Sequence, residues 1–268
     1  FKMDGSDDPI EWGRPQNDGP AFRALALIEF TNTLLDRKEQ SDLIPLLYDG
    51  RHPMETNGVI KKDLEYIAAN WVNPSYDVWE EVAGRHFFTL MIQRRALVEG
   101  AKLARRLNDP GAADHYEFNL NRINKLLARH WDAKKHYIVS TLEYAYGVDN
   151  KTSNLDSAVI LGVLYGGVEG FSFGVADDRV MATALRLEET FKELYPLNRN
   201  ANSADLGVAI GRYPEDAYDG VNRHGGNPWY LTTYAMGEYY YRLAGAFEKA
   251  GNITVTPRSL DVLKNAVS

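Results

Sequence analysis

Apolar residues recur at three- and four-residue steps along most of this 268-residue chain. That spacing puts them on one face of an α-helix, so the sequence predicts a mainly helical fold. The clearest example runs from His86 to Leu107 and ends before Asn108-Asp109-Pro110-Gly111, a strong helix breaker. We expect about eight helices, paired antiparallel through loops of unequal length. Besides 86–107, they follow Pro20 and Gly111, span about 60–71, 154–165 and 177–194, and begin at Asn227 and near Ser259.

Local signals mark two helix starts and one strand. Asp177 and Asp178 are candidates for the N-cap of the helix that follows them. Asn227 followed by Pro228 predicts a capping Asn with Pro in the first helical position. Residues 136–146 alternate loosely between apolar and polar side chains, which indicates a short hairpin strand.

Charge and residue usage exclude several classes of function. The 30 basic and 37 acidic side chains give a net charge of −7. This argues against a nucleic-acid partner, because such proteins concentrate Lys and Arg on one face. No apolar run approaches the ~18–20 residues of a membrane helix, so we expect no membrane partner. The chain has no Cys, and its six His lack metal-ligand spacing, so no metal site is expected.

Three loops concentrate Trp, Tyr, Arg and carboxylates beside Gly and Pro. They span residues 11–19, 75–82 and 211–218, each next to a predicted helix. Alternate connections of an antiparallel helix array emerge at the same end, so we expect these loops to converge on one mouth. The composition suits a sugar, since pyranose rings stack on aromatic side chains and their hydroxyls bond to charged groups.

The second loop contains a candidate acid. Glu80 follows Trp79, and an indole packed against a carboxyl raises the pKa of that carboxyl. Hydrolysis of a glycosidic bond needs two carboxyl groups, one of them protonated. Glu81 should point elsewhere, because adjacent residues do not share a face. The plainer interpretation is a solvated acidic turn near a helix start, with Arg14 or Arg212 as a loop-pinning ion pair.

Blocks of sequence in these loops resemble the glucoamylases of glycoside hydrolase family 15. The resemblance extends over nearly the whole chain, with the blocks in the family's order. It implies an (α/α)6 barrel of twelve helices, of which the chain would hold about eight. Residues 1–268 would then be part of a single catalytic domain, with N- and C-terminal segments missing. The blocks are Trp12–Pro20, Asp77–Glu81, His86–Thr89, Leu155–Ala158, Gly211–Asp216 and Gly226–Trp229.

The resemblance also implies an activity and its residues. Family members hydrolyse α-1,4-glucosidic bonds with inversion, release glucose from the non-reducing ends of starch and maltooligosaccharides, and need no cofactor. Glu80 matches the general acid, and Asp77 matches a carboxylate that supports it. We expect a secreted protein, with the vacuole as the alternative, that is a monomer at full length. The residues implied to line the substrate site are Trp12, Asp77, Glu81, Arg212, Asp216 and Trp229.

Some features of the family have no match in this chain. The segment before the first block, which grips the terminal glucose, is absent, and the general base is expected beyond residue 268. We therefore expect the isolated chain to be inactive. Asp8 stands where the family usually has Tyr, and the loop 219–225 is longer than in several relatives.

Two other functions remain open for a chain with this resemblance. The first is a non-catalytic glucan-binding or regulatory module with the same barrel. The second is a family 15 relative that acts on dextran or trehalose. The motif Trp79-Glu80-Glu81 favours an enzyme over a module, because a binding module needs no protonated acid.

Overall fold

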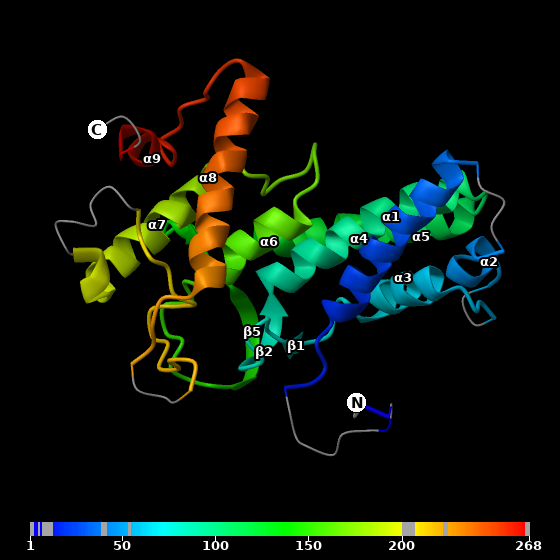
Figure 1. Ribbon diagram of the computed structural model, residues 1–268, viewed down its shortest axis with the longest axis horizontal. Helices are drawn as coiled ribbons and strands as arrows, with labels where there is room; N and C mark the ends of the chain where they lie inside the picture. The colour runs from blue at the N-terminus through cyan, green and yellow to red at the C-terminus, as the bar shows by residue number, and fades with distance from the viewer. Residues whose placement is uncertain are drawn as a thin grey trace.

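The long helix α4 (Phe87–Arg106) lies at the centre of the computed structural model, which describes residues 3–4, 6, 13–38, 42–52, 55–199, 207–221 and 225–265. It contacts α1 (Gly19–Asp36), α3 (Val59–Asn70), α5 (Pro110–Ala128) and α6 (Ala158–Gly166). Figure 1 shows α1, α3 and α5 at one end, and α6, α7 (Asp178–Leu194) and α8 (Tyr230–Ala250) toward the other. The described part of the chain also contains three short helices: α2 (Ile44–Leu47), the 3-10 helix η1 (Pro196–Arg199) and α9 (Leu260–Asn265). The prediction of a mainly helical fold is confirmed.

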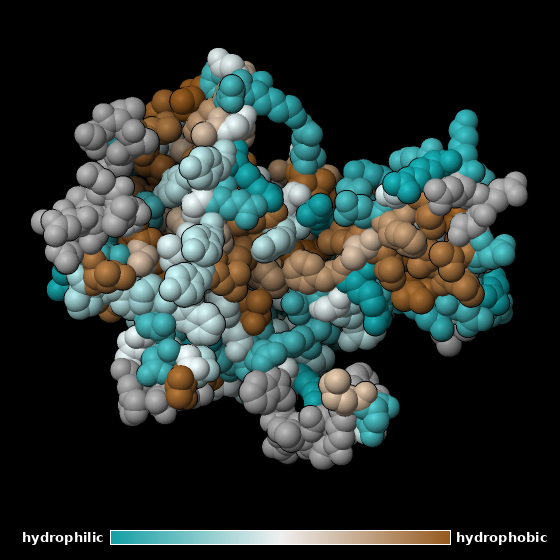
Figure 2. All heavy atoms as spheres, in the orientation of Figure 1, coloured by the Kyte–Doolittle hydropathy of each residue, from teal (hydrophilic) through white to brown (hydrophobic). Residues whose placement is uncertain are grey.

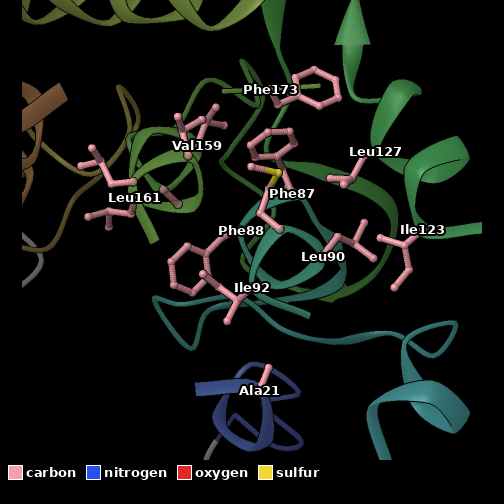
Figure 3. Close-up of a cluster of buried hydrophobic side chains, with 14 of the residues drawn as sticks. Ala21, Phe87, Phe88, Leu90, Ile92, Ile123, Leu127, Val159, Leu161 and Phe173 are labelled. Carbon is pink, nitrogen blue, oxygen red and sulfur yellow. The ribbon is translucent and has the colours of Figure 1, made fainter. Parts of the chain in front are cut away.

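Apolar residues gather among the helices, whereas the strands and loops beside them are more polar. Figure 2 shows this contrast on one face: brown predominates between the helices, and teal or white near the lower edge. Inside, Phe87 and Leu90 of α4 pack between Leu127 of α5 and Val159 of α6 (Figure 3). Burial of each such side chain contributes about 1.5–3 kcal/mol. This core fixes the N-terminal end of α4.

Two glycines bring α6 directly onto α4. Gly162 and Gly166 are four residues apart and therefore lie on one face of α6. A Cβ atom at Gly166 would lie 2.5 Å from the carbonyl carbon of Met91, and one at Gly162 would lie 3.1 Å from the Cα of Phe88. The two backbones thus approach as closely as glycine allows, which places the residues before α6 beside the start of α4.

A small antiparallel sheet adjoins the N-terminal end of α4, which follows directly on β2. Its strands are β1 (Ser75–Tyr76), β2 (Val82–His86) and β5 (Thr141–Gly147), in the order β1-β2-β5. Ala83 pairs with both Tyr76 and Tyr146, and the register shifts between Ala83 and Arg85. A second pair, β3 (Trp131–Asp132) and β4 (Tyr137–Ile138), follows α5. Residues 77–81 are therefore the turn of a β-hairpin.

The local predictions had mixed outcomes. Asp177 is the N-cap of α7, and its carboxylate accepts a hydrogen bond from the N–H of Arg179, as predicted. The predicted start at Asn227 is wrong: α8 begins at Tyr230, because Trp229 has extended backbone and the Asn227 amide donates to the carbonyl of Pro228. Helix α6 begins at Ala158 rather than at residue 154. The predicted strand over 136–146 corresponds to β4 and β5, and β2 was not predicted.

A buried histidine makes stability depend on pH. The His130 ring is fully buried against Phe87, and its Nδ1 lies 2.7 Å from the carbonyl oxygen of Val139. Burial lowers the pKa of His130 from 6.5 to about 4. The folded protein thus resists a proton that the unfolded chain accepts, so this residue's contribution is complete above pH 6.5 and is lost as the pH falls toward 4. Between pH 6.5 and 4, we expect the titration of His130 to lower the free energy of unfolding by about 3 kcal/mol.

Urea unfolding at pH 7, 5.5 and 4 tests this expectation. The control is His130→Asn, whose amide can still donate to Val139 but does not titrate. The variant should lose markedly less stability on acidification than the wild type. Parallel losses in the two proteins would contradict the assignment to His130.

Candidate active site

The hairpin turn between β1 and β2 carries two adjacent glutamates. Asp77 organises it: its Oδ1 accepts hydrogen bonds from the N–H groups of Glu81 (2.8 Å) and Val82 (3.1 Å), and its carbonyl accepts one from Glu80 (2.9 Å). Glu80 has a left-handed backbone, with φ of 63°. Such a conformation is uncommon for a residue with a side chain and persists where the surroundings fix it.

The N-terminal loop lies against this turn. A Cβ atom at Gly13 would lie 2.8 Å from the carbonyl oxygen of Glu80, so only glycine fits there without a shift. The carbonyl of Pro15 accepts a hydrogen bond from the N–H of Tyr76 (2.8 Å). Burial, assisted by the charge of Glu80, raises the pKa of Asp18. Glu80 therefore interacts with the N-terminal side of the site.

Glu81 contacts the third loop instead. Its Oε1 lies 3.0 Å from Nη2 of Arg212, and its Oε2 accepts a hydrogen bond from the Tyr213 hydroxyl (2.7 Å). Arg212 also forms two bonds of 2.7 Å to Asp216, through Nε and Nη2. The side chain of Glu81 thus points to the third loop.

Burial and charge fix the protonation of this cluster. Burial of Arg212 alone would lower its pKa, but the bond to Asp216 and the charge of Glu81 outweigh it, and the pKa lies above its usual value. Burial and the bond to Glu81 raise the pKa of Tyr213. Arg212 is therefore a cation and Tyr213 a hydrogen-bond donor at any pH at which the protein works.

Arg212 keeps unused donors. Its guanidinium has five N–H groups. Nε and Nη2 bond to Asp216 and Glu81, whereas Nη1 has no hydrogen bond within the described part of the chain. Oε1 of Glu81 accepts a bond from Arg212 and Oε2 accepts one from Tyr213, and each carboxylate oxygen can accept a further bond. The cluster can therefore hold itself together and still bind hydroxyl groups.

Aromatic rings surround the guanidinium. Its Cζ lies 5.5 Å from the ring centroid of Trp79, 5.4 Å from that of Tyr218 and 5.3 Å from that of Trp229. The rings of Trp79 and Trp229 are 6.4 Å apart. All three aromatic residues are partly exposed. Flat apolar rings beside charged hydrogen-bonding groups match the two kinds of surface that a pyranose presents.

The structure brings together most of the residues that the sequence singled out. Glu81, Arg212, Asp216 and Trp229 form one cluster, and Asp77 lies behind it in the hairpin turn. Trp12 lies outside the described residues, as does Asp8 and part of the loop 219–225. The predicted convergence of the three loops is confirmed for their described parts.

Sequence reasoning missed three residues around this cluster. Tyr213 lies inside a quoted block, but nothing in the sequence distinguishes a hydroxyl bonded to Glu81 from a packed ring. Glu215 accepts hydrogen bonds from Ser153 N–H (2.7 Å) and Thr152 Oγ1 (3.1 Å), which ties a further loop to the site. Lys151 in that loop reaches the back of the hairpin turn. A lysine beside Asn and Thr carries no signal of such a position.

The described residues contain no candidate membrane span and no candidate metal site. No helix there combines the length and the hydropathy that a membrane span needs. In the same part of the chain, no group of three or more His, Cys, Asp or Glu side chains is arranged to hold a metal ion.

The chain is similar to glycoside hydrolases of known family. A family model described as "Glycosyl hydrolases family 15" matches residues 2–268. A glucoamylase of Blastobotrys adeninivorans is 40% identical over 258 residues, covering 94% of this chain and 41% of that protein. Glucoamylase 1 of Rhizopus oryzae is 35% identical over 268 residues, covering 98% and 42%. The chain thus spans about two fifths of the length of these curated relatives.

Solved structures agree with this comparison. A glucoamylase from Saccharomycopsis fibuligera superposes with a TM-score of 0.82 at 31% identity, covering 97% of this chain and 55% of that one. A family 15 glucoamylase from Hypocrea jecorina gives 0.81 at 33% identity, covering 94% and 39%. The predicted fold class, the (α/α)6 barrel of the glucoamylases, is confirmed.

Proposed function

This chain belongs to glycosyl hydrolase family 15, and from that membership we propose that it is the part of an exo-acting glucoamylase that carries the general acid. The enzyme would hydrolyse α-1,4-glucosidic bonds of starch and maltooligosaccharides and release glucose from their non-reducing ends. The observation that supports this most is the hairpin turn of Glu80 and Glu81 facing the Arg212–Asp216 pair and its aromatic rings.

We assign Glu80 the role of general acid. It would donate its proton to the glycosidic oxygen as the bond to the anomeric carbon breaks, so that the leaving sugar departs as an alcohol. A water molecule would attack the opposite face of the ring, activated by a second carboxylate about 6.5–9.5 Å from the first, and the product would be the inverted β-glucose. From the family resemblance, we expect that base after residue 268.

The remaining residues would bind the substrate and stabilise its transition state. Glu81 and the Nη1 group of Arg212 would bond to sugar hydroxyls, and Trp229 would lie against a sugar face. Glu81, Asp216 and Arg212 together carry one net negative charge. That charge would stabilise the positive charge that develops on the sugar ring in an oxocarbenium-like transition state.

We further propose that the protein is secreted and acts as a monomer. Starch supplied from outside is too large to cross a cell membrane, so an enzyme that degrades it from chain ends would act outside the cell. The bonds of Arg212 to Glu81 and Asp216 lie within one chain, and the base is expected further along the same polypeptide, so the site would need no residue of a second copy.

Glucose release from maltotriose tests the proposed function. The assay uses a complete family 15 domain that carries this chain, and proton NMR follows the anomer formed first. We expect glucose as the β-anomer from the non-reducing end. A domain that binds maltotriose without releasing glucose would be a glucan-binding module, and a domain that cleaves only dextran or trehalose would have another substrate. Either result would contradict the proposal.

A further inference from the structure

A buried lysine lies behind the hairpin turn. The Nζ of Lys151 is 3.0 Å from Oδ2 of Asp77 and 2.8 Å from Oδ2 of Asp156. The lysine side chain is 8% exposed, and those of the two aspartates 6% and 1%. A charge so far from water persists only where its partners compensate for the lost hydration. One ammonium group therefore joins two carboxylates that are 79 positions apart in the sequence.

The second oxygen of each carboxylate holds one side of the Glu80 motif. Oδ1 of Asp77 accepts the backbone N–H groups of Glu81 and Val82. Oδ1 of Asp156 accepts the indole N–H of Trp79 (2.9 Å). The residues on both sides of Glu80 are thus fixed through carboxylates that share the ammonium of Lys151.

Lys151 also reaches the partner of Glu81. Its Nζ lies 4.1 Å from the ring centroid of Tyr213, a cation–π distance, and the hydroxyl of that ring bonds to Glu81. A residue of the third loop fixes the loop that carries Lys151, because Glu215 accepts hydrogen bonds from the next two residues, Thr152 and Ser153. The lysine is therefore anchored independently of the turn that it contacts.

Lys151 and Asp77 both stay ionised. Burial alone would lower the pKa of Lys151, but Asp156 and Asp77 outweigh it and raise the pKa above its usual value. Burial alone would raise the pKa of Asp77, but Lys151 and His86 outweigh it and lower the pKa. The ammonium and the carboxylate remain ionised together, so their attraction persists over the whole neutral and mildly acidic range.

We propose that Lys151 is a positioning residue: through Asp77 and Asp156 it fixes the Trp79-Glu80-Glu81 turn, and so holds Glu80 where it can reach the glycosidic oxygen. This inference rests on the proposed function, in which Glu80 is the acid. Lys151 itself touches no substrate. Misplacement of a catalytic group by about 1 Å costs on the order of 10²-fold in rate, which sets the expected size of the effect.

Two substrates separate acid placement from general damage. Maltose needs a proton on its leaving oxygen, whereas α-glucosyl fluoride releases fluoride with little help from an acid. In Lys151→Met we expect kcat for maltose to fall about 10²-fold and kcat for the fluoride to fall less than about tenfold, with KM for maltose changed less than about threefold. The variant is made in a complete family 15 domain that carries this chain.

The matched control is Lys135→Met. Lys135 bonds to the carbonyl of Ser153 in the same loop (2.7 Å), and it is not among the partners of Asp77 or Asp156. It should keep both activities. Equal losses on maltose and on the fluoride in Lys151→Met, or no loss on either, would overturn the inference. A wild-type domain inactive on both substrates would instead reject the proposed function.

A double variant covers the case in which Lys151→Met does not fold. Lys151→Met with Asp156→Asn has the net charge of the wild-type cluster, and the amide oxygen introduced at position 156 can still accept the Trp79 N–H. We expect its thermal stability to exceed that of the single variant while the selective loss on maltose persists. Recovery of both stability and maltose turnover would mean that Lys151 only neutralises charge, which would overturn the positioning role.

Discussion

Glu80→Gln in a complete family 15 domain is expected to lower kcat for maltose by about 10²- to 10⁴-fold, the range for loss of a general acid. The amide has the size and polarity of the carboxyl but no acidic proton. KM should change little, because the hydrogen bonds assigned to substrate hydroxyls come from Glu81 and Arg212. Initial rates of glucose release over a range of maltose concentrations measure both parameters.

A second substrate tests whether Glu80 acts as a proton donor or supports activity in another way. The loss on α-glucosyl fluoride should be smaller than on maltose, since fluoride leaves without a full proton. The matched control is Glu248→Gln, which makes the same chemical change at an exposed position on α8. Near-normal turnover of maltose by Glu80→Gln would show that Glu80 is not the acid.

Helical periodicity predicted the scaffold because the helices pack on one another. Leu120, Ile123 and Leu127 of α5 recur at helical spacing because one side of that helix packs against α4. The pattern failed where tertiary contacts decide. Asn227-Pro228 has the chemistry of a helix start, yet Trp229 is held in extended backbone by its N–H bond to the carbonyl of Ile210. Local capping signals do not include such a contact.

The sequence predicted some residues of the candidate site and missed others. Side chains that bind hydroxyls or donate protons belong to a few residue types, so Glu80, Glu81 and Arg212 could be proposed as site residues from the loops that carry them. Lys151 could not, because its position results from carboxylates 74 residues before and five residues after it. Strand β2 was not predicted either, because Ala83 and Gly84 have weak strand propensity and its partner β5 is distant in sequence.

Arg212→Met is expected to lower the free energy of unfolding by about 3–5 kcal/mol, because it leaves buried carboxylates without their cation. The side chain of Asp216 is 1% exposed and that of Glu81 14%. Urea unfolding at neutral pH measures the loss. The control, Arg258→Met, removes an exposed arginine that also pairs with an aspartate, Asp178, and lies over an indole. It should cost less than about 1 kcal/mol.

A double variant decides between two interpretations of Arg212 that the sequence left open, a loop-pinning ion pair and a sugar ligand. In Arg212→Met with Asp216→Asn, one of the two unpaired charges is removed, so part of the lost stability should return. If Arg212 only pins the loop, maltose turnover should return in proportion. If its Nη1 group also binds a hydroxyl, turnover should stay low in the stabilised double variant. Because Nε and Nη2 bond to carboxylates while Nη1 is unused within the described residues, we expect the second result.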